Sequence, residues 1–213
     1  VISTDRTSDT NWFVWHKDLA NASAGTHILN LDTTGAEFNP GINHINDTAP
    51  TASAFAFGGY MGAHADTGDG AGETQDKIVY SFKSIPGFSK FGKFIGNQNA
   101  SGPFIHCGFA PAFVMIKTLA TGNWNMIDST RAPTSLTEDS TGTQQNYNGQ
   151  YGRPVLYMDD TTTESYTNTM QGQMDLLSNG FKLRSDHSSG NTDGGTIIFM
   201  AFAETPFKYA NAI

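Results

Sequence analysis

The stretch that decides the fold runs from residue 196 to residue 203 and reads TIIFMAFA. Almost every residue in it is apolar, several are β-branched or aromatic, and the turn residues Gly194-Gly195 precede it. A continuous apolar run of this length predicts a strand in the middle of a β-sandwich, covered on both faces. A related string, IVYSF, occupies residues 78–82, and Pro86 follows it at the distance at which Pro206 follows residues 198–202.

Three further pairs of strings repeat in the same order along the chain. Asn11-Trp12 returns as Asn123-Trp124, and LNLDTT at residues 29–34 returns as LYMDDT at residues 156–161. SAFAF at residues 53–57 aligns with NGFKL at residues 179–183. The offsets are 112, 127 and 126, against 120 for the pair described first, so the order is kept while the spacing drifts. We interpret this pattern as a tandem duplication of one fold whose loops differ in length.

The composition is typical of many short strands joined by turns. Gly is frequent, with 23 residues, and Ser, Thr, Asn and Asp separate the apolar runs. No long stretch keeps a 3.6-residue period, although short helical turns are possible near residues 18–22 and 169–176. We therefore predict an all-β protein of two tandem β-sandwich modules of jelly-roll type, residues 1–86 and 87–213. Strands are expected at about 1–4, 11–16, 27–31, 53–57 and 77–83 in the first module, and at about 93–96, 104–109, 112–118, 123–128, 155–159, 180–184 and 196–204 in the second.

The start of the first module differs from that of the second. Residues 93–96 and 104–109 precede the repeated strands of the second copy, whereas nothing in the sequence precedes Val1. We expect the first module to be an N-terminally truncated copy and the chain to be the C-terminal piece of a longer polypeptide.

Charge and cysteine content exclude several classes of partner. The formal net charge is −8 and Lys/Arg residues form no run, which argues against nucleic acid and against an anionic membrane surface. No apolar stretch approaches the roughly 20 residues that span a bilayer. The single Cys107 excludes an intrachain disulfide and a multi-cysteine zinc site, and its apolar neighbours predict a buried, unreactive thiol.

The two long loops differ between the copies and are the best sequence guide to a contact surface. The loop at residues 128–154 of the second copy is far longer than the corresponding loop of the first copy. Conversely, the loop at residues 58–76 of the first copy is longer than the corresponding loop of the second. Tyrosines and amide side chains at and beyond the end of the long second-copy loop combine aromatic rings with hydrogen-bonding groups, which is the chemistry of sugar binding. Alternatively, these tyrosines and amides pack against their own or a neighbouring subunit. The candidate ligand-binding residues are Asn146, Tyr147, Asn148, Gln150, Tyr151 and Tyr166.

A second candidate site is the acidic, glycine-rich stretch DTGDGAGE at residues 66–73. Its carboxylates, Asp66, Asp69 and Glu73, are hard oxygen ligands of the kind that Ca²⁺ prefers, but their spacing is not that of an EF-hand. The alternative is a flexible acidic loop without a metal. Residues 191–195 (NTDGG) are a weaker case of the same kind. We expect no other cofactor.

No catalytic signature is evident. The six His residues show no convincing metal-binding spacing, and Ser89 lies outside a Gly-x-Ser-x-Gly elbow. Asp159 and Asp160 are adjacent, so on a strand they would point to opposite faces rather than across a cleft. Asp32 occupies the place of Asp159 in the first copy, which favours a turn role for both. Trp12 and Trp124 likewise occupy equivalent places, which favours structural packing, and we expect no enzymatic activity.

Five strings of the chain carry a resemblance: GFSKFG at residues 87–92, ASGPF at 100–104, GFAPAFVMIK at 108–117, LSNGFKLR at 177–184 and MAFAE at 200–204. They resemble a domain that is widespread near the C-termini of tail fibres and other virion structural proteins of marine tailed bacteriophages. The resemblance covers the second copy almost completely and the first mainly at Asn11-Trp12, residues 14–16 and residues 48–51. It implies a lectin-like, concanavalin-type fold on the virion surface and carries no catalytic residues with it.

The resemblance leads to an expected function. We expect a virion protein, the C-terminal region of a tail fibre or appendage, that binds a host receptor or glycan, forms a homo-oligomer (a trimer, by analogy with fibres) and contacts other virion proteins. The alternatives are a capsid decoration or head-fibre protein that stabilises the virion, and a polysaccharide depolymerase. Nucleic-acid binding and membrane insertion are not expected.

Overall fold

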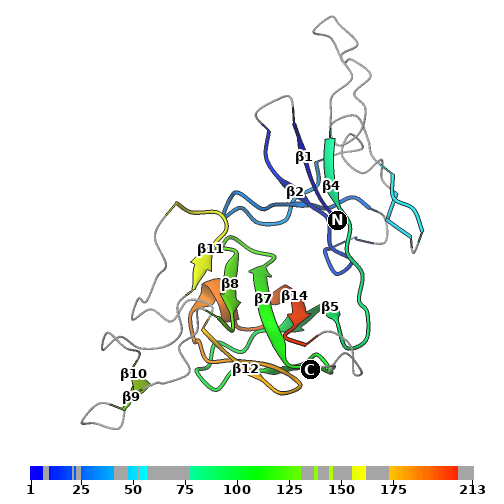
Figure 1. Cartoon of the computed structure of the whole chain (residues 1–213). Helices are drawn as coiled ribbons and strands as arrows, with labels where there is room; N and C mark the ends of the chain where they lie inside the picture. Colours follow the sequence, from blue (N-terminus) through cyan, green and yellow to red (C-terminus); the bar gives the residue numbers. More distant parts are fainter. Residues whose placement is uncertain are drawn as a thin grey trace, which may run out of the picture. The chain divides into compact units, whose positions relative to one another are not determined.

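The computed structural model describes two compact units, Val1–Phe82 and Lys83–Ile213 (Figure 1). The division falls four residues before the sequence-based boundary at 86/87. The described residues are 1–6, 10–20, 22, 25–40, 48–51, 53–56, 77–130, 155–161 and 173–205, together with the backbone of 137–138 and 144–145. Within them, short strands dominate and a single four-residue helix occurs, so the protein is all-β, as predicted.

The larger sheet of the second unit has five antiparallel strands in the order β11-β8-β7-β14-β5. The strand predicted to be central, β14 (Thr196–Ala203), pairs with β7 (Pro111–Thr118) on one side and with β5 (Ser89–Ile95) on the other. Beyond β7 lie β8 (Asn125–Asp128) and β11 (Leu156–Tyr157). Because β14 is hydrogen-bonded to a neighbouring strand along both of its edges, its apolar residues belong to a buried, central strand.

The second sheet of this unit has three antiparallel strands in the order β12-β13-β6. They are β12 (Met174–Leu177), β13 (Gly180–Leu183) and β6 (Phe104–His106). Ser178-Asn179 form the two-residue connection between β12 and β13. Residues 173–176 are wrong as a helical turn: Met174 and Leu176 lie on the same, core-facing side of strand β12, and pairing with β13 overrides their local helical preference.

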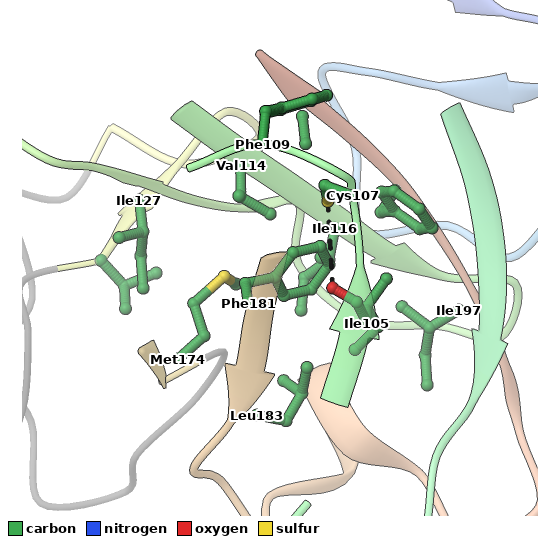
Figure 2. Close-up of a cluster of buried hydrophobic side chains, with 13 residues drawn as sticks. Ile105, Cys107, Phe109, Val114, Ile116, Ile127, Met174, Phe181, Leu183 and Ile197 are labelled. Atoms are coloured by element: carbon green, nitrogen blue, oxygen red, sulfur yellow. Dashed lines mark hydrogen bonds between the residues drawn. The ribbon is translucent and has the colours of Figure 1, made fainter. Parts of the chain in front are cut away.

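The two sheets pack face to face around one hydrophobic core (Figure 2). Phe181 of β13 lies at its centre, with its ring 5.4 Å from that of Phe199 in β14 and 6.2 Å from that of Phe94 in β5. This sandwich is the architecture predicted for the second module. The buried members of the core are Ile105, Cys107, Phe109, Val114, Ile116, Ile127, Val155, Met174, Phe181, Leu183, Ile197, Phe199 and Ala201.

A clasp of buried hydrogen bonds closes one end of this unit. The short helix α1 (Ser188–Asn191) ends at Asn191, whose amide nitrogen donates to Asn97 Oδ1, Asn99 O and Ser185 O. Its amide oxygen accepts the backbone N–H of Asn97 at 2.9 Å. A Cβ on Gly96 would lie 2.2 Å from the carbonyl oxygen of Thr192, so the close approach of these segments requires glycine.

The first unit contains a four-stranded antiparallel sheet in the order β3-β2-β1-β4. Its strands are β1 (Ile2–Asp5), β2 (Phe13–Val14), β3 (Leu29–Asn30) and β4 (Lys77–Tyr80). One face packs Phe13 and Trp15 against the buried Ile28. The predicted strand at 53–57 is wrong over the described residues 53–56, because Ala54 bonds back to Thr51 in a turn.

The strand order of the first unit repeats within the second. β3-β2-β1-β4 corresponds to β11-β8-β7-β14, and the strands follow one another along the chain in the same sequence. The register agrees residue by residue. Across the first sheet one row is Leu29, Val14, Ile2, Tyr80, and across the second it is Leu156, Met126, Met115, Met200. Three of these pairs carry the sequence offsets 127, 112 and 120, so three of the four repeated strings occupy equivalent places in the two sheets. The fourth pair does not, because residues 53–56 form a turn whereas residues 180–183 form β13.

Two further short strands lie in the stretch predicted as a long loop. β9 (Thr137–Glu138) and β10 (Gln144–Gln145) pair with each other in antiparallel fashion.

Candidate functional site

The residues predicted to bind a ligand or a metal lie outside the described residues. This holds for Asn146, Tyr147, Asn148, Gln150, Tyr151 and Tyr166, and for Asp66, Asp69 and Glu73. Among the residues that the structure does describe, no group of three or more His, Cys, Asp or Glu side chains comes together in a way that could hold a metal.

The repeated Trp and Asp make the same contacts in both units. In the first, the backbone N–H of Trp12 donates to Asp32 Oδ1 at 3.3 Å, and Leu31 N–H donates to the Trp12 carbonyl oxygen at 2.8 Å. In the second, Trp124 N–H donates to Asp159 Oδ1 at 3.2 Å, and Met158 N–H donates to the Trp124 carbonyl oxygen at 3.2 Å. Each carboxylate thus links the turn that follows one strand (β3 or β11) to the Trp that precedes the neighbouring strand (β2 or β8). The predicted turn role of Asp32 and Asp159 is confirmed.

The side chains around the repeated Trp differ between the units. Trp124 is only 3% exposed, as structural packing predicts. Trp12 is partly exposed, and its ring lies nearly parallel to that of Tyr80, with the centroids 6.3 Å apart and the planes 18° apart. Tyr80 is 48% exposed, and its counterpart in the second unit is Met200. The first unit therefore presents a pair of aromatic rings where the second has a buried indole and a thioether.

Lys117 forms a buried cationic centre in the second unit. Its side chain is fully buried, and Nζ donates to the carbonyl oxygens of Thr118 and Ala120 at 3.0 Å each. Burial lowers the pKa of Lys117 to about 8, although the charge of Asp159 opposes the shift. Burial also raises the pKa of Asp159, and its Oδ2 is a buried oxygen without a hydrogen-bond partner among the described residues. Because Lys117 is fully buried and its Nζ donates to backbone carbonyl oxygens, this centre is internal and presents no cation at the surface.

Cys107 belongs to the core, as predicted. Its thiol lies 3.9 Å from the carbonyl oxygen of Ile105, and burial raises the pKa of Cys107 to about 11. The thiolate is the reactive form of cysteine, so a thiol with this pKa is a poor nucleophile at neutral pH.

Two of the four described histidines have local structural roles. His187 caps α1 by accepting the N–H of Ser189 on Nδ1, and His16 accepts the N–H of Asp18 in the same way. The Asn191 clasp uses both the nitrogen and the oxygen of its amide within the protein, so the calcium-like string at 191–195 does not have this oxygen available for a metal.

Comparison with known proteins gives one result. The family model described as a domain of unknown function (DUF7483) matches residues 1–206, a match that runs through both units. The chain belongs to this family. No curated protein and no solved structure matches the chain.

The DUF7483 match thus covers both copies of the duplicated sheet. Within the described residues of this family member, no helix is long and apolar enough to cross a membrane.

Sequence reasoning missed the Tyr80 and Lys117 environments. For Tyr80 a signal was present, since the offset of 120 aligns it with Met200 and marks a change from thioether to phenol at one repeated position. For Lys117 no signal was present, because a lysine in an apolar run is equally compatible with an exposed end of a strand.

Proposed function

We propose that this chain is a non-enzymatic module on the surface of a bacteriophage virion, the C-terminal region of a tail fibre or similar appendage that contacts a glycan on the host cell. The phage assignment rests on the strings that resemble virion proteins. In the structure these strings overlap β5, β6, β7, β13 and β14, the strands that contribute most of the core of the second unit. The resemblance therefore lies in the scaffold.

The observation that carries the binding function is the contrast between repeated scaffold and altered surface. The strand order, the register and the Trp–Asp bonds agree in the two units, while the side chains beside Trp12 and Trp124 differ. A stable sheet that holds variable surface groups is a common basis for recognition. The net charge of −8 supports an uncharged or cationic partner rather than a polyanion.

Recognition by one such module would be weak, and copies on one particle would strengthen it. We propose a closed homo-oligomer, a trimer as in fibres, attached to other virion proteins. Several modules that engage one cell surface raise the apparent affinity by roughly 10²–10⁴-fold over a single site.

A competition experiment with the purified full chain tests this function. We expect the chain to bind host cells and to reduce adsorption of the parent phage, and antibodies against it to label the tail tip of intact particles. Labelling of the head at hundreds of copies per virion would contradict the proposal and establish a capsid decoration protein. Loss of viscosity of the host polysaccharide on incubation with the chain would contradict it in favour of a depolymerase.

A further inference from the structure

We propose that the Trp12–Tyr80 ring pair binds a sugar unit that is neutral or carries an amino group. This inference rests on the proposed function and assigns it a place on the first unit. Both residues belong to that unit, and both lie within the described residues.

The geometry of the pair leaves ring surface available. Aromatic rings in direct face contact lie about 3.5–4 Å apart. Since the centroids of Trp12 and Tyr80 are 6.3 Å apart while the planes differ by only 18°, the rings are nearly parallel but are not stacked centre to centre in direct face contact. Tyr80 also keeps 48% of its surface exposed. The two rings therefore lie in nearly parallel planes, and aromatic surface, chiefly that of Tyr80, stays exposed beside the partly exposed Trp12.

The sheet holds this surface in place. Tyr80 lies on β4 and Trp12 precedes β2, and both strands pair with β1. Strands two positions apart in a sheet are separated by about 10 Å. The shorter distance between the ring centroids means that the two side chains lean toward each other over β1. The backbone of Trp12 is fixed on both sides, by its N–H bond to Asp32 and by its carbonyl bond to Leu31.

The chemistry of the surroundings favours a sugar. One face of a pyranose carries C–H groups of slightly positive character, which are attracted to the negative face of an aromatic ring. Asp32 lies beside Trp12, is exposed, and uses only Oδ1 in a bond among the described residues. Its second oxygen can accept a hydrogen bond from a hydroxyl or an ammonium group. The same carboxylate, with a net chain charge of −8, disfavours uronic acids and phosphates.

The second unit provides an internal comparison. It keeps the Trp and the Asp of the arrangement but buries the indole and replaces Tyr80 by Met200. The scaffold role of the Trp–Asp bonds therefore does not require an exposed tyrosine. The aromatic partner is a feature that the first unit alone has at this position, and we assign sugar binding to the first unit.

The test uses the full chain on a printed array of bacterial glycans that includes neutral, amino-sugar and uronic-acid oligosaccharides. Tyr80→Met installs the residue of the second unit, and Tyr80→Phe keeps the ring. Phe104→Ala is the matched control, because Phe104 is an aromatic residue of similar exposure, 46%, in the second unit. Thermal melts establish that each variant is folded.

We expect the wild-type chain to bind neutral or amino sugars. Tyr80→Met should lose at least about 10-fold in affinity. Tyr80→Phe, which keeps the ring, and the control Phe104→Ala should both stay within about 3-fold of wild type. Equal binding by wild type and folded Tyr80→Met would overturn the assignment of the site and leave the proposed function standing. Adsorption to host cells without binding to any glycan would also overturn the site, since the receptor would then be of another class. Failure of wild type both on the array and on host cells would overturn the proposed function itself.

Discussion

At the scale of single residues, Lys117 shows how a buried charge makes stability depend on pH. Its pKa of about 8 lies below the ordinary 10.5, so between these pH values the unfolded chain binds more protons than the folded chain. The free energy of unfolding therefore rises as the pH increases from 8 toward 10.5. Cys107 acts in the opposite direction above pH 9, because its raised pKa of about 11 keeps the proton on the folded form.

Comparison of wild type with Lys117→Met isolates the contribution of the lysine. We expect the free energy of unfolding of wild type to gain about 2 kcal/mol relative to the variant between pH 8 and pH 10, since each unit of pKa difference is worth about 1.4 kcal/mol. Urea titrations at several pH values provide the measurement, and the contribution of Cys107 cancels in the difference. Parallel pH profiles for the two proteins would show that Lys117 is not held as a buried cation.

The two Asp residues at the repeated turns give a second prediction at this scale. Asp159→Ala removes the acceptor of the half-buried Trp124 N–H and should cost about 1–3 kcal/mol of unfolding free energy. Asp32→Ala removes the equivalent acceptor at an exposed site, where water can replace it, and should cost less than about 1 kcal/mol. Denaturant titration of both variants provides the comparison, with Asp159→Asn as the control that keeps an oxygen. A larger loss for Asp32→Ala would contradict the burial argument.

At the scale of elements, the contact between β1 and β4 differs from its counterpart between β7 and β14. Asp5 and Lys77 lie opposite each other in the first unit and form an ion pair with Nζ 2.8 Å from Oδ2, both side chains being largely buried. The paired residues at the equivalent positions of the second unit are Thr118 and Ile197. The same strand contact is thus made with an ion pair in one copy and with a neutral pair in the other.

Substitutions that copy the second unit into the first separate the pair from the strand contact. Lys77→Ile alone removes the Lys77 ammonium from the buried carboxylate of Asp5 and should cost about 3–5 kcal/mol. The double variant Asp5→Thr/Lys77→Ile removes both charges and should recover most of that loss, since a buried ion pair is often no more stabilising than neutral residues of similar size. Thermal unfolding of the single and double variants is the measurement. A double variant as unstable as Lys77→Ile would show that the two sheets do not tolerate each other's side chains.

At the scale of the whole molecule, short apolar runs between turn residues predicted the all-β fold, and the repeated strings predicted its duplication, because strand position is encoded locally. Trp12 and Trp124 each precede a strand, and Ile78 and Ile198 each lie within one, so matching strings mark matching places in two sheets. Sequence could not show that Met174–Leu177 is a strand, because its partner β13 supplies the preference for extended backbone. It also could not show that Tyr80 and Trp12 meet, since their contact depends on the pairing of β1 with both β2 and β4.

The separation into two units leads to a prediction about folding. All thirteen buried members of the core around Phe181 belong to residues 83–213, and both sheets that enclose them lie in the same range. Since hydrophobic burial is the main favourable term in folding, this range contains what it needs to fold by itself. We expect a protein of residues 83–213 to unfold cooperatively on heating, with the far-ultraviolet circular dichroism of a β protein. Its single Trp124 should report the transition by fluorescence, because it is buried in the folded state.

The full chain supplies the control for this fragment. Trp12 and Trp15 report on the first unit and Trp124 on the second, so the variant Trp12→Phe/Trp15→Phe isolates the signal of the second unit in the intact protein. The midpoint of that signal should agree with the midpoint of the fragment within a few degrees, because the buried cluster is complete in both. A fragment that shows no cooperative transition, or that melts far below the intact chain, would mean that the core of the second unit depends on residues 1–82.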